Sequence, residues 1–264
     1  MNRRSSISRL SVGCAALLAV IGLALAGCGS GSGSGSGSGA PSSSAASSSS
    51  AGPASSSAGS AGTGTSPAGS FAGTPLFPAA VGDTWVYQVT TAGRPAGTAT
   101  DKVTAVMPVA GGDQVTTTHD LHGTTLEETF LFGSNGSISM PLPSLGSSTF
   151  KIKSGGIVWP SHAQIMSGQP HSSTITATIS VAGQTHAVST HVTVWGAGSA
   201  TVTVPAGTYH ATVIDDTLTE KLMGVSVSIR IRTWLAPGIG PVKSQVTTNG
   251  TPVSGEELTS FTKG

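Results

Sequence analysis

Residues 225–235 read VSVSIRIRTWL, and the alternation in this stretch decides the fold class of the chain. Successive side chains of a β-strand point to opposite faces of a sheet. One face of this stretch is apolar and carries Val225, Val227, Ile229 and Ile231. The other face is polar and carries Ser226, Ser228, Arg230 and Arg232. The pattern predicts a strand with one buried and one solvated face.

The same alternation extends in both directions from this stretch. Residues 174–181 place four apolar side chains on one face: Ile175, Ala177, Ile179 and Val181. Trp85, Tyr87 and Val89 alternate with smaller or polar residues over residues 85–89. Further strands are expected over residues 97–107, 114–118, 124–132, 137–140, 149–153, 185–195, 200–204, 208–220, 241–247 and 257–261. A sustained helical period is missing, and residues 160–169 offer the only plausible helical turn.

Short turns separate these strands, as expected for hairpins. Asn135-Gly136 and Asn249-Gly250 are strong hairpin signals, and turns are also expected at residues 93–95, 183–184 and 205–207. The fold class predicted is therefore all-β and mainly antiparallel. Because the strands have one dry face, the sheet must curl or be covered. We expect a curved sheet or half-barrel, with a two-sheet sandwich as the second choice.

The N-terminal residues have the pattern of a bacterial lipoprotein precursor. Arg3, Arg4 and Arg9 precede an apolar run, which ends in Leu25-Ala26-Gly27-Cys28. This order is typical of a signal peptide followed by a lipobox. Residues 1–27 are therefore predicted to be removed, and Cys28 to carry the lipid that anchors the protein to the membrane. Arg3-Arg4 leaves twin-arginine export open beside the general secretory route.

Low-complexity sequence follows Cys28. Residues 29–39 alternate Gly and Ser, and Ser, Ala and Pro dominate up to residue 73. Such a segment lacks the apolar side chains that would offset the entropy of ordering it. We predict three parts: a signal peptide over residues 1–27, a lipid-bearing Cys28 with a disordered linker over residues 28–74, and one antiparallel β domain over residues 75–264.

Charge and cysteine content exclude several function classes. Charged residues are only 9% of the chain, and loss of the three N-terminal arginines leaves nine Lys and Arg against 11 Asp and Glu. No basic patch is present for nucleic acid, which is not expected as a partner. The two cysteines are Cys14 and Cys28, so the β domain has neither a disulfide nor a thiolate nucleophile.

Three motifs resemble a family of poorly characterised bacterial exported domains. Residues 78–87 (PAAVGDTWVY) match its opening P-x-x-V-G-x-x-W-x-Y segment. Residues 202–209 (VTVPAGTY) and 234–243 (WLAPGIGPVK) match its V-P-A-G-T-F/Y and W-x-A-P-G-x-G-x-V-K turns. The resemblance implies a curved antiparallel sheet, similar in shape to lipoprotein carriers and lipid-binding envelope lipoproteins. It implies no catalytic residue and no cofactor.

The spacing of the candidate catalytic and metal-binding residues does not predict that their side chains meet at one site. His119 and His122 are spaced so that they leave a strand on opposite faces, and the histidines are expected on the surface. A zinc site needs three or four convergent ligands. The neighbouring carboxylates of Asp215-Asp216 and of Glu127-Glu128 diverge in the same way, and no G-x-S-x-G elbow precedes a helix. We therefore expect no enzyme, no metal and no cofactor.

Aromatic and arginine side chains are the remaining candidates for ligand contact. The candidate residues are Trp85, Tyr87, Arg230, Arg232 and Trp234. Aromatic side chains fill cores, and they also line apolar pockets. The first hypothesis is a lipid-anchored extracytoplasmic protein whose β domain binds an apolar or amphipathic envelope ligand. The alternative is a structural or protein-interaction module of the cell envelope, with sheet edges that accept a partner strand.

The lipobox interpretation predicts the effect of Cys28→Ser. Without the thiol that accepts the lipid, the protein should leave the membrane fraction and appear in the soluble extracytoplasmic fraction. Cell fractionation and immunoblotting measure this, with Cys14→Ser as the matched control that should remain on the membrane. Unchanged membrane association of Cys28→Ser would contradict the interpretation.

Overall fold

The computed structural model describes residues 76–141, 150–181, 184–222 and 225–264. The predicted signal peptide, Cys28 and the linker lie outside the described residues, as does Gly183 of the turn expected at residues 183–184, whereas Gln184 pairs with Val181. No helix in the described part of the chain is both long and apolar enough to cross a membrane.

The described residues form one sheet of 13 strands, and every pairing in it is antiparallel. The strands are β1 (Thr84–Thr91), β2 (Arg94–Val109), β3 (Gly112–Leu121), β4 (Thr124–Gly133), β5 (Ile138–Pro141), β6 (Phe150–Ser154), β7 (Gly156–Trp159), β8 (His171–Val181), β9 (Gln184–Val204), β10 (Gly207–Leu222), β11 (Val225–Ala236), β12 (Gly240–Thr248) and β13 (Thr251–Thr262). One short helix, α2 (His162–Met166), lies in the predicted helical turn.

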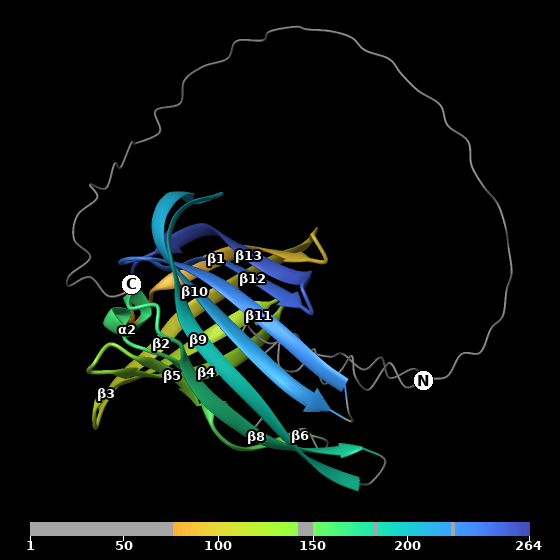
Figure 1. Cartoon of the computed structure of the whole chain (residues 1–264). Helices are drawn as coiled ribbons and strands as arrows, with labels where there is room; N and C mark the ends of the chain where they lie inside the picture. Colours follow the sequence, from red (N-terminus) through yellow and green to blue (C-terminus); the bar gives the residue numbers. More distant parts are fainter. Residues whose placement is uncertain (1–75, 142–149, 182–183, 223–224) are drawn as a thin grey trace, which may run out of the picture.

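The sheet curls into a nearly closed, barrel-like form (Figure 1). Its strand order is β6-β8-β9-β10-β11-β12-β13-β1-β2-β3-β4-β5-β7. The first strand pairs with the last, so β1 and β13 join two runs of hairpins into one sheet. The predicted all-β, antiparallel curved sheet is confirmed, and the second choice of a two-sheet sandwich is not what forms.

Local details depart from the strands and turns expected from the sequence. The strands expected at residues 185–195 and 200–204 are one strand, β9, with an irregular register opposite Thr212 and Ile214. The first hairpin turns at Ala92 and Gly93, both with positive φ, and Arg94 and Pro95 already pair with β1. Strand β7 is absent from the expected strands, because Gly156-Ile157-Val158-Trp159 is a short apolar run without alternation.

Two groups of buried apolar residues fill the interior. One includes Ile175, Val192, Ile214, Leu218 and Ile231, and the other includes Trp85, Val103, Val115, Val242 and Leu258. Ile229 and Ile231 are each 3% exposed. The side chains of Arg230 and Arg232, which alternate with them, are 46% and 37% exposed. The face assignment predicted from the alternation is therefore confirmed for residues 229–232.

Trp85 ties the start of the sheet to its C-terminal strands. Its side chain is 1% exposed, and its indole N–H donates to the carbonyl of Ile239 at 2.6 Å. The ring stacks on Phe261 with centroids 5.2 Å apart. The hydroxyl of Tyr87 on the same strand donates to the carbonyl of Pro241 at 3.1 Å. Strand β1 is therefore held to the β11–β12 turn through side chains as well as to β13 through its backbone.

Asp83 makes a second connection at this point. Its side chain is fully buried, and its two carboxylate oxygens each accept a backbone N–H at 2.9 Å, one from Ala80 and one from Gly264. The carboxylate thus holds the loop before β1 against the residues after β13.

The Trp85 contacts predict that replacing tryptophan by phenylalanine lowers the free energy of unfolding more at this position than at an outer one. Trp85→Phe leaves the partly buried carbonyl of Ile239 without its donor and should lower the free energy of unfolding by about 1–3 kcal/mol. The matched change Trp195→Phe, at a partly buried outer position, should cost less than about 1 kcal/mol. Urea denaturation of the two variants tests this. An equal loss of unfolding free energy in both variants would contradict the proposed role of the Trp85–Ile239 hydrogen bond.

Candidate functional site

An apolar pocket of about 230 Å³ lies between the two parts of the core. Its apolar walls come from both core groups, from the segment before β1 and from α2: Leu76, Phe77, Phe132, Ile138, Trp159, Ile165, Ile214 and Leu235. These residues are far apart in the sequence, and the curl of the sheet brings them together. Apolar lining with few polar groups is typical of small-molecule sites.

Helix α2 forms one side of this pocket, and its position depends on two local features. Ser161 caps the helix and Gln164 reciprocates, which is a capping box that fixes where the helix starts. Gly196 of β9 lies directly beneath the helix. A Cβ atom added to Gly196 would stand 2.0 Å from the carbonyl oxygen of Ile165, so only glycine permits this close approach. Ile165 is thereby pressed into the core, where it is 4% exposed.

A buried carboxylate orients the aromatic wall of the pocket. The indole N–H of Trp159 donates to Oδ2 of Asp216 at 2.9 Å. Asp216 is 2% exposed, and its Oδ1 has no hydrogen-bond partner in the described ranges. Burial raises the pKa of Asp216 to about 7, against the lowering effect of the Trp159 hydrogen bond, and the negative charge of Asp215 adds to the rise. Asp216 is therefore a positioning residue for Trp159.

Polar groups are few at the pocket, and one of them is unsatisfied. Nε2 of His162 is buried and has no hydrogen-bond partner in the described part of the chain, although His162 lines the pocket. Ser137 also lines the pocket, and its hydroxyl donates to Asn135 at 2.7 Å. Among the described residues, the side chain of His162 thus places one buried nitrogen without a partner at the edge of an apolar wall.

The five candidate contact residues fall into two separate places. Trp85 and Tyr87 lie in the core, 1% and 3% exposed, and line neither this pocket nor the groove described below. Arg230, Arg232 and Trp234 lie together on the outer face of β11. The guanidinium carbon of Arg232 is 6.0 Å from the ring centroid of Trp234.

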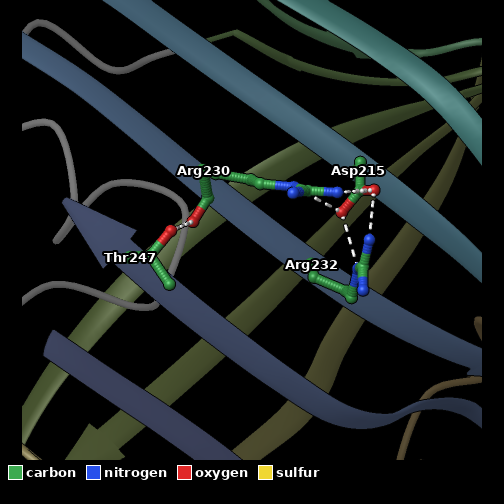
Figure 2. A network of polar contacts seen from close by, with 4 residues as sticks. All are labelled: Asp215, Arg230, Arg232 and Thr247. Atoms are coloured by element: carbon green, nitrogen blue, oxygen red, sulfur yellow. Dashed lines mark hydrogen bonds and ion pairs between the residues drawn. The ribbon is translucent and has the colours of Figure 1, made fainter. Parts of the chain in front are cut away.

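Asp215 binds both arginines on the outer face (Figure 2). Its carboxylate is fully buried, and each arginine donates to it through Nε and Nη2, at 3.2 and 2.6 Å from Arg230 and at 2.9 and 2.8 Å from Arg232. Burial by itself would raise the pKa of Asp215, but the hydrogen bonds and charges of Arg232 and Arg230 hold it below its usual value. Neighbouring carboxylates diverge here as expected, and only Asp215 faces outward.

The expectation that the histidines lie on the surface is wrong for His119. This residue is 3% exposed, and its Nδ1 lies 2.5 Å from Oδ1 of Asp101, its direct partner across β2 and β3. Burial lowers the pKa of His119, but the hydrogen bond to Asp101 and the charges of Asp101, Glu256 and Glu128 outweigh it and raise the pKa above 6.5. The physical reason is that the partner carboxylate compensates for burial.

No three His, Cys, Asp or Glu side chains in the described ranges converge closely enough to hold a metal ion. Sequence reasoning missed the pocket, Gly196 and the pairing of Trp159 with Asp216. Alternation marks Asp216 as inward-facing together with Ile214 and Leu218, and this was the one available signal. The contacts themselves join strands that are distant in the chain, and no local pattern identifies them.

The two adjacent aspartates predict opposite effects of Asp→Asn on stability. For Asp216, the folded-state pKa is raised, so stability falls as pH rises from about 4 to 7, by a few kcal/mol. Asp216→Asn should therefore stabilise the protein at pH 8 and change little at pH 4. For Asp215, the folded-state pKa is lowered, so Asp215→Asn should destabilise the protein at pH 8, with a smaller effect at acid pH. Urea unfolding at both pH values measures this, and loss of stability at pH 8 in both variants would contradict it.

Comparisons with known proteins agree with this architecture. An exported protein with a YmcC-like fold from Bacteroides fragilis superimposes with a TM-score of 0.50 at 17% identity, over 72% of this chain and 100% of that one. A protein described as a lipoprotein from Parabacteroides distasonis gives a TM-score of 0.54 at 16% identity, over 72% of this chain and 99% of that one. At these identities the likeness concerns the fold alone.

Sequence comparison gives the family. No curated protein matches the chain. The profile of the DUF3108-like family matches residues 81–258, which is more than half of the chain and spans β1 to β13. The chain belongs to the DUF3108-like family.

Proposed function

We propose that this protein is a lipid-anchored extracytoplasmic lipoprotein whose barrel-like domain binds the apolar part of an amphipathic cell-envelope ligand. The observation that carries the proposal is the apolar pocket between α2 and the two parts of the core. Its walls are formed by side chains, and it lies on the dry side of the sheet, where the sequence predicted either a filled core or an open cavity.

The size of the pocket sets the kind of ligand. A dry cavity of about 150 Å³ lined by aliphatic and aromatic residues is enough to bind a single benzene ring. The pocket of about 230 Å³ is larger than that but below the range of roughly 300–1,000 Å³ common for whole drug-sized ligands. It therefore suits one ring or one segment of an acyl chain, with the rest of the ligand outside.

The polar lining favours an amphipathic ligand over a pure hydrocarbon. The buried Nε2 of His162 lacks a partner in the described residues, and a buried polar atom without a partner costs free energy. A turn of the His162 ring toward the pocket would let a ligand hydroxyl or carboxyl group satisfy this nitrogen, which has no accessible surface in the described position. Trp159, held by Asp216, supplies a rigid aromatic surface beside it.

The sequence and the relatives support the cellular location in this proposal. Cys28 at the end of a signal-peptide pattern is the expected lipid attachment site. The two proteins of the same fold are described as exported and as a lipoprotein, respectively. The linker of residues 28–74 would then let the domain reach ligands at a distance from the membrane surface.

The proposal predicts that the protein carries a ligand when it is isolated from its own cells. Full-length Cys28→Ser protein, purified without detergent, should yield an amphipathic molecule on organic extraction and mass spectrometry. Ile138→Trp in the same background fills the pocket and should reduce the ligand-to-protein ratio about tenfold, since the ligand loses its apolar contacts.

The matched control for this experiment is Met166→Trp. Met166 is the neighbour of Ile165 in α2, is 50% exposed and does not line the pocket, so its replacement should leave the ligand content unchanged. Ligand-free protein in every preparation would overturn the proposal and favour the alternative of a structural or protein-interaction module. Equal loss in both tryptophan variants would show that the pocket is not the binding site.

A further inference from the structure

The outer face of the sheet carries a polar groove that is separate from the apolar pocket. The groove has a volume of about 310 Å³ and lies over β10, β11 and β12. Its lining side chains are Thr217, Ser228, Arg230, Arg232, Gln245 and Thr247. Each of these can donate a hydrogen bond, and none is a carboxylate. Such a lining is suited to a ligand that is rich in acceptors.

The charge balance of the groove is positive. Arg230 and Arg232 contribute two guanidinium groups, and Asp215 beneath them contributes one carboxylate, which leaves an excess of one positive charge. Lys243 lies on the same face, but it pairs with Glu257 at 2.7 Å. The uncompensated charge is therefore located at the arginine pair.

The arginines are held in position and still have donors to spare. Each guanidinium uses Nε and Nη2 to bind Asp215, which fixes its plane (Figure 2). Neither Nη1 atom has a protein partner in the described residues. Arg230 also lies 5.9 Å from the ring centroid of Trp195, and Arg232 lies 6.0 Å from that of Trp234. Such pre-organised guanidinium groups lose little entropy on binding an oxyanion.

We propose that this groove binds the phosphate group of a polyol phosphate ester, through the free Nη1 donors of Arg230 and Arg232. The hydroxyl groups of Thr217, Ser228 and Thr247 and the amide of Gln245 then contact the polyol. A phosphate ester offers several non-bridging oxygens, so one group can accept from both Nη1 donors and from a hydroxyl group at the same time. The groove is also larger than a phosphate ion, so an attached polar body fits beside it.

Isothermal titration calorimetry with the full-length Cys28→Ser protein in detergent-free buffer tests this inference. The probes are sn-glycerol 3-phosphate and, for the same group on a lipid, monomeric dihexanoyl phosphatidylglycerol. Binding should weaken as salt increases, because charge attraction contributes to it. Binding of glycerol phosphate alone would assign the site to free esters, and binding of the short-chain lipid alone would assign it to headgroups. Absence of binding of both probes would overturn the proposal.

Two kinds of variant locate the binding in the groove. Arg230→Gln and Arg232→Gln should each raise the dissociation constant about tenfold, since each removes one charge-assisted contact. Because these variants also disturb Asp215, Gln245→Glu provides a second test. Gln245 is exposed and is the cross-strand partner of Arg232. A carboxylate there should weaken binding by about tenfold or more through repulsion of the anion, without removing a contact of Asp215.

Matched controls separate the groove from general charge effects. Gln88→Glu makes the same substitution at an exposed position of β1, and Lys243→Gln removes a cation that lies outside the groove lining. Both should leave the dissociation constant within about twofold of the wild-type value. Weakening by Gln88→Glu equal to that by Gln245→Glu would overturn the assignment to this groove.

Discussion

The pairing of β1 with β13 is the contact on which the rest of the structure depends. Every other neighbour relation from β8 to β13 and from β1 to β5 is a hairpin between consecutive strands, whereas β1 and β13 meet across most of the domain. A hairpin closes a short loop, and this pairing closes a very long one, so it needs support from side chains. Trp85, Tyr87 and Asp83 supply that support by bonding to backbone groups of the β11–β12 turn, of β12 and of the residues after β13.

A single curled sheet has one interior, and in this protein that interior is not uniformly apolar. Asp216 is buried beside the aliphatic core, and His119 is paired with Asp101 on the other side. A specific hydrogen bond compensates for the burial of each side chain. Asp216 accepts a hydrogen bond from Trp159, and His119 is bonded to Asp101. Asp216 nevertheless keeps one oxygen without a partner in the described residues, so it lowers stability at neutral pH while it orients a wall of the pocket.

The two sides of the sheet lend themselves to different chemistry. The inner side has an apolar pocket bounded by α2, and the outer side has a groove with an arginine pair over a buried carboxylate. The residue pair Asp215-Asp216 connects them, because adjacent positions of β10 point to opposite faces. Asp215 fixes the arginines outside, and Asp216 fixes Trp159 inside. One dipeptide thus contributes to the geometry of both proposed sites.

The sequence by itself determined most of the strands, several of their turns, the antiparallel class and which side chains of residues 229–232 face inward. These depend on neighbours within a few residues, so alternation and Asn-Gly turns report them directly. Only the tertiary structure decided that Trp85 bonds to the β11–β12 turn from within the core and that Gly196 leaves room for α2. It also decided that His119 is buried and that an apolar pocket lies beside Trp159. Each of these depends on groups brought together from strands far apart in the chain, and the curvature of the whole sheet sets those distances.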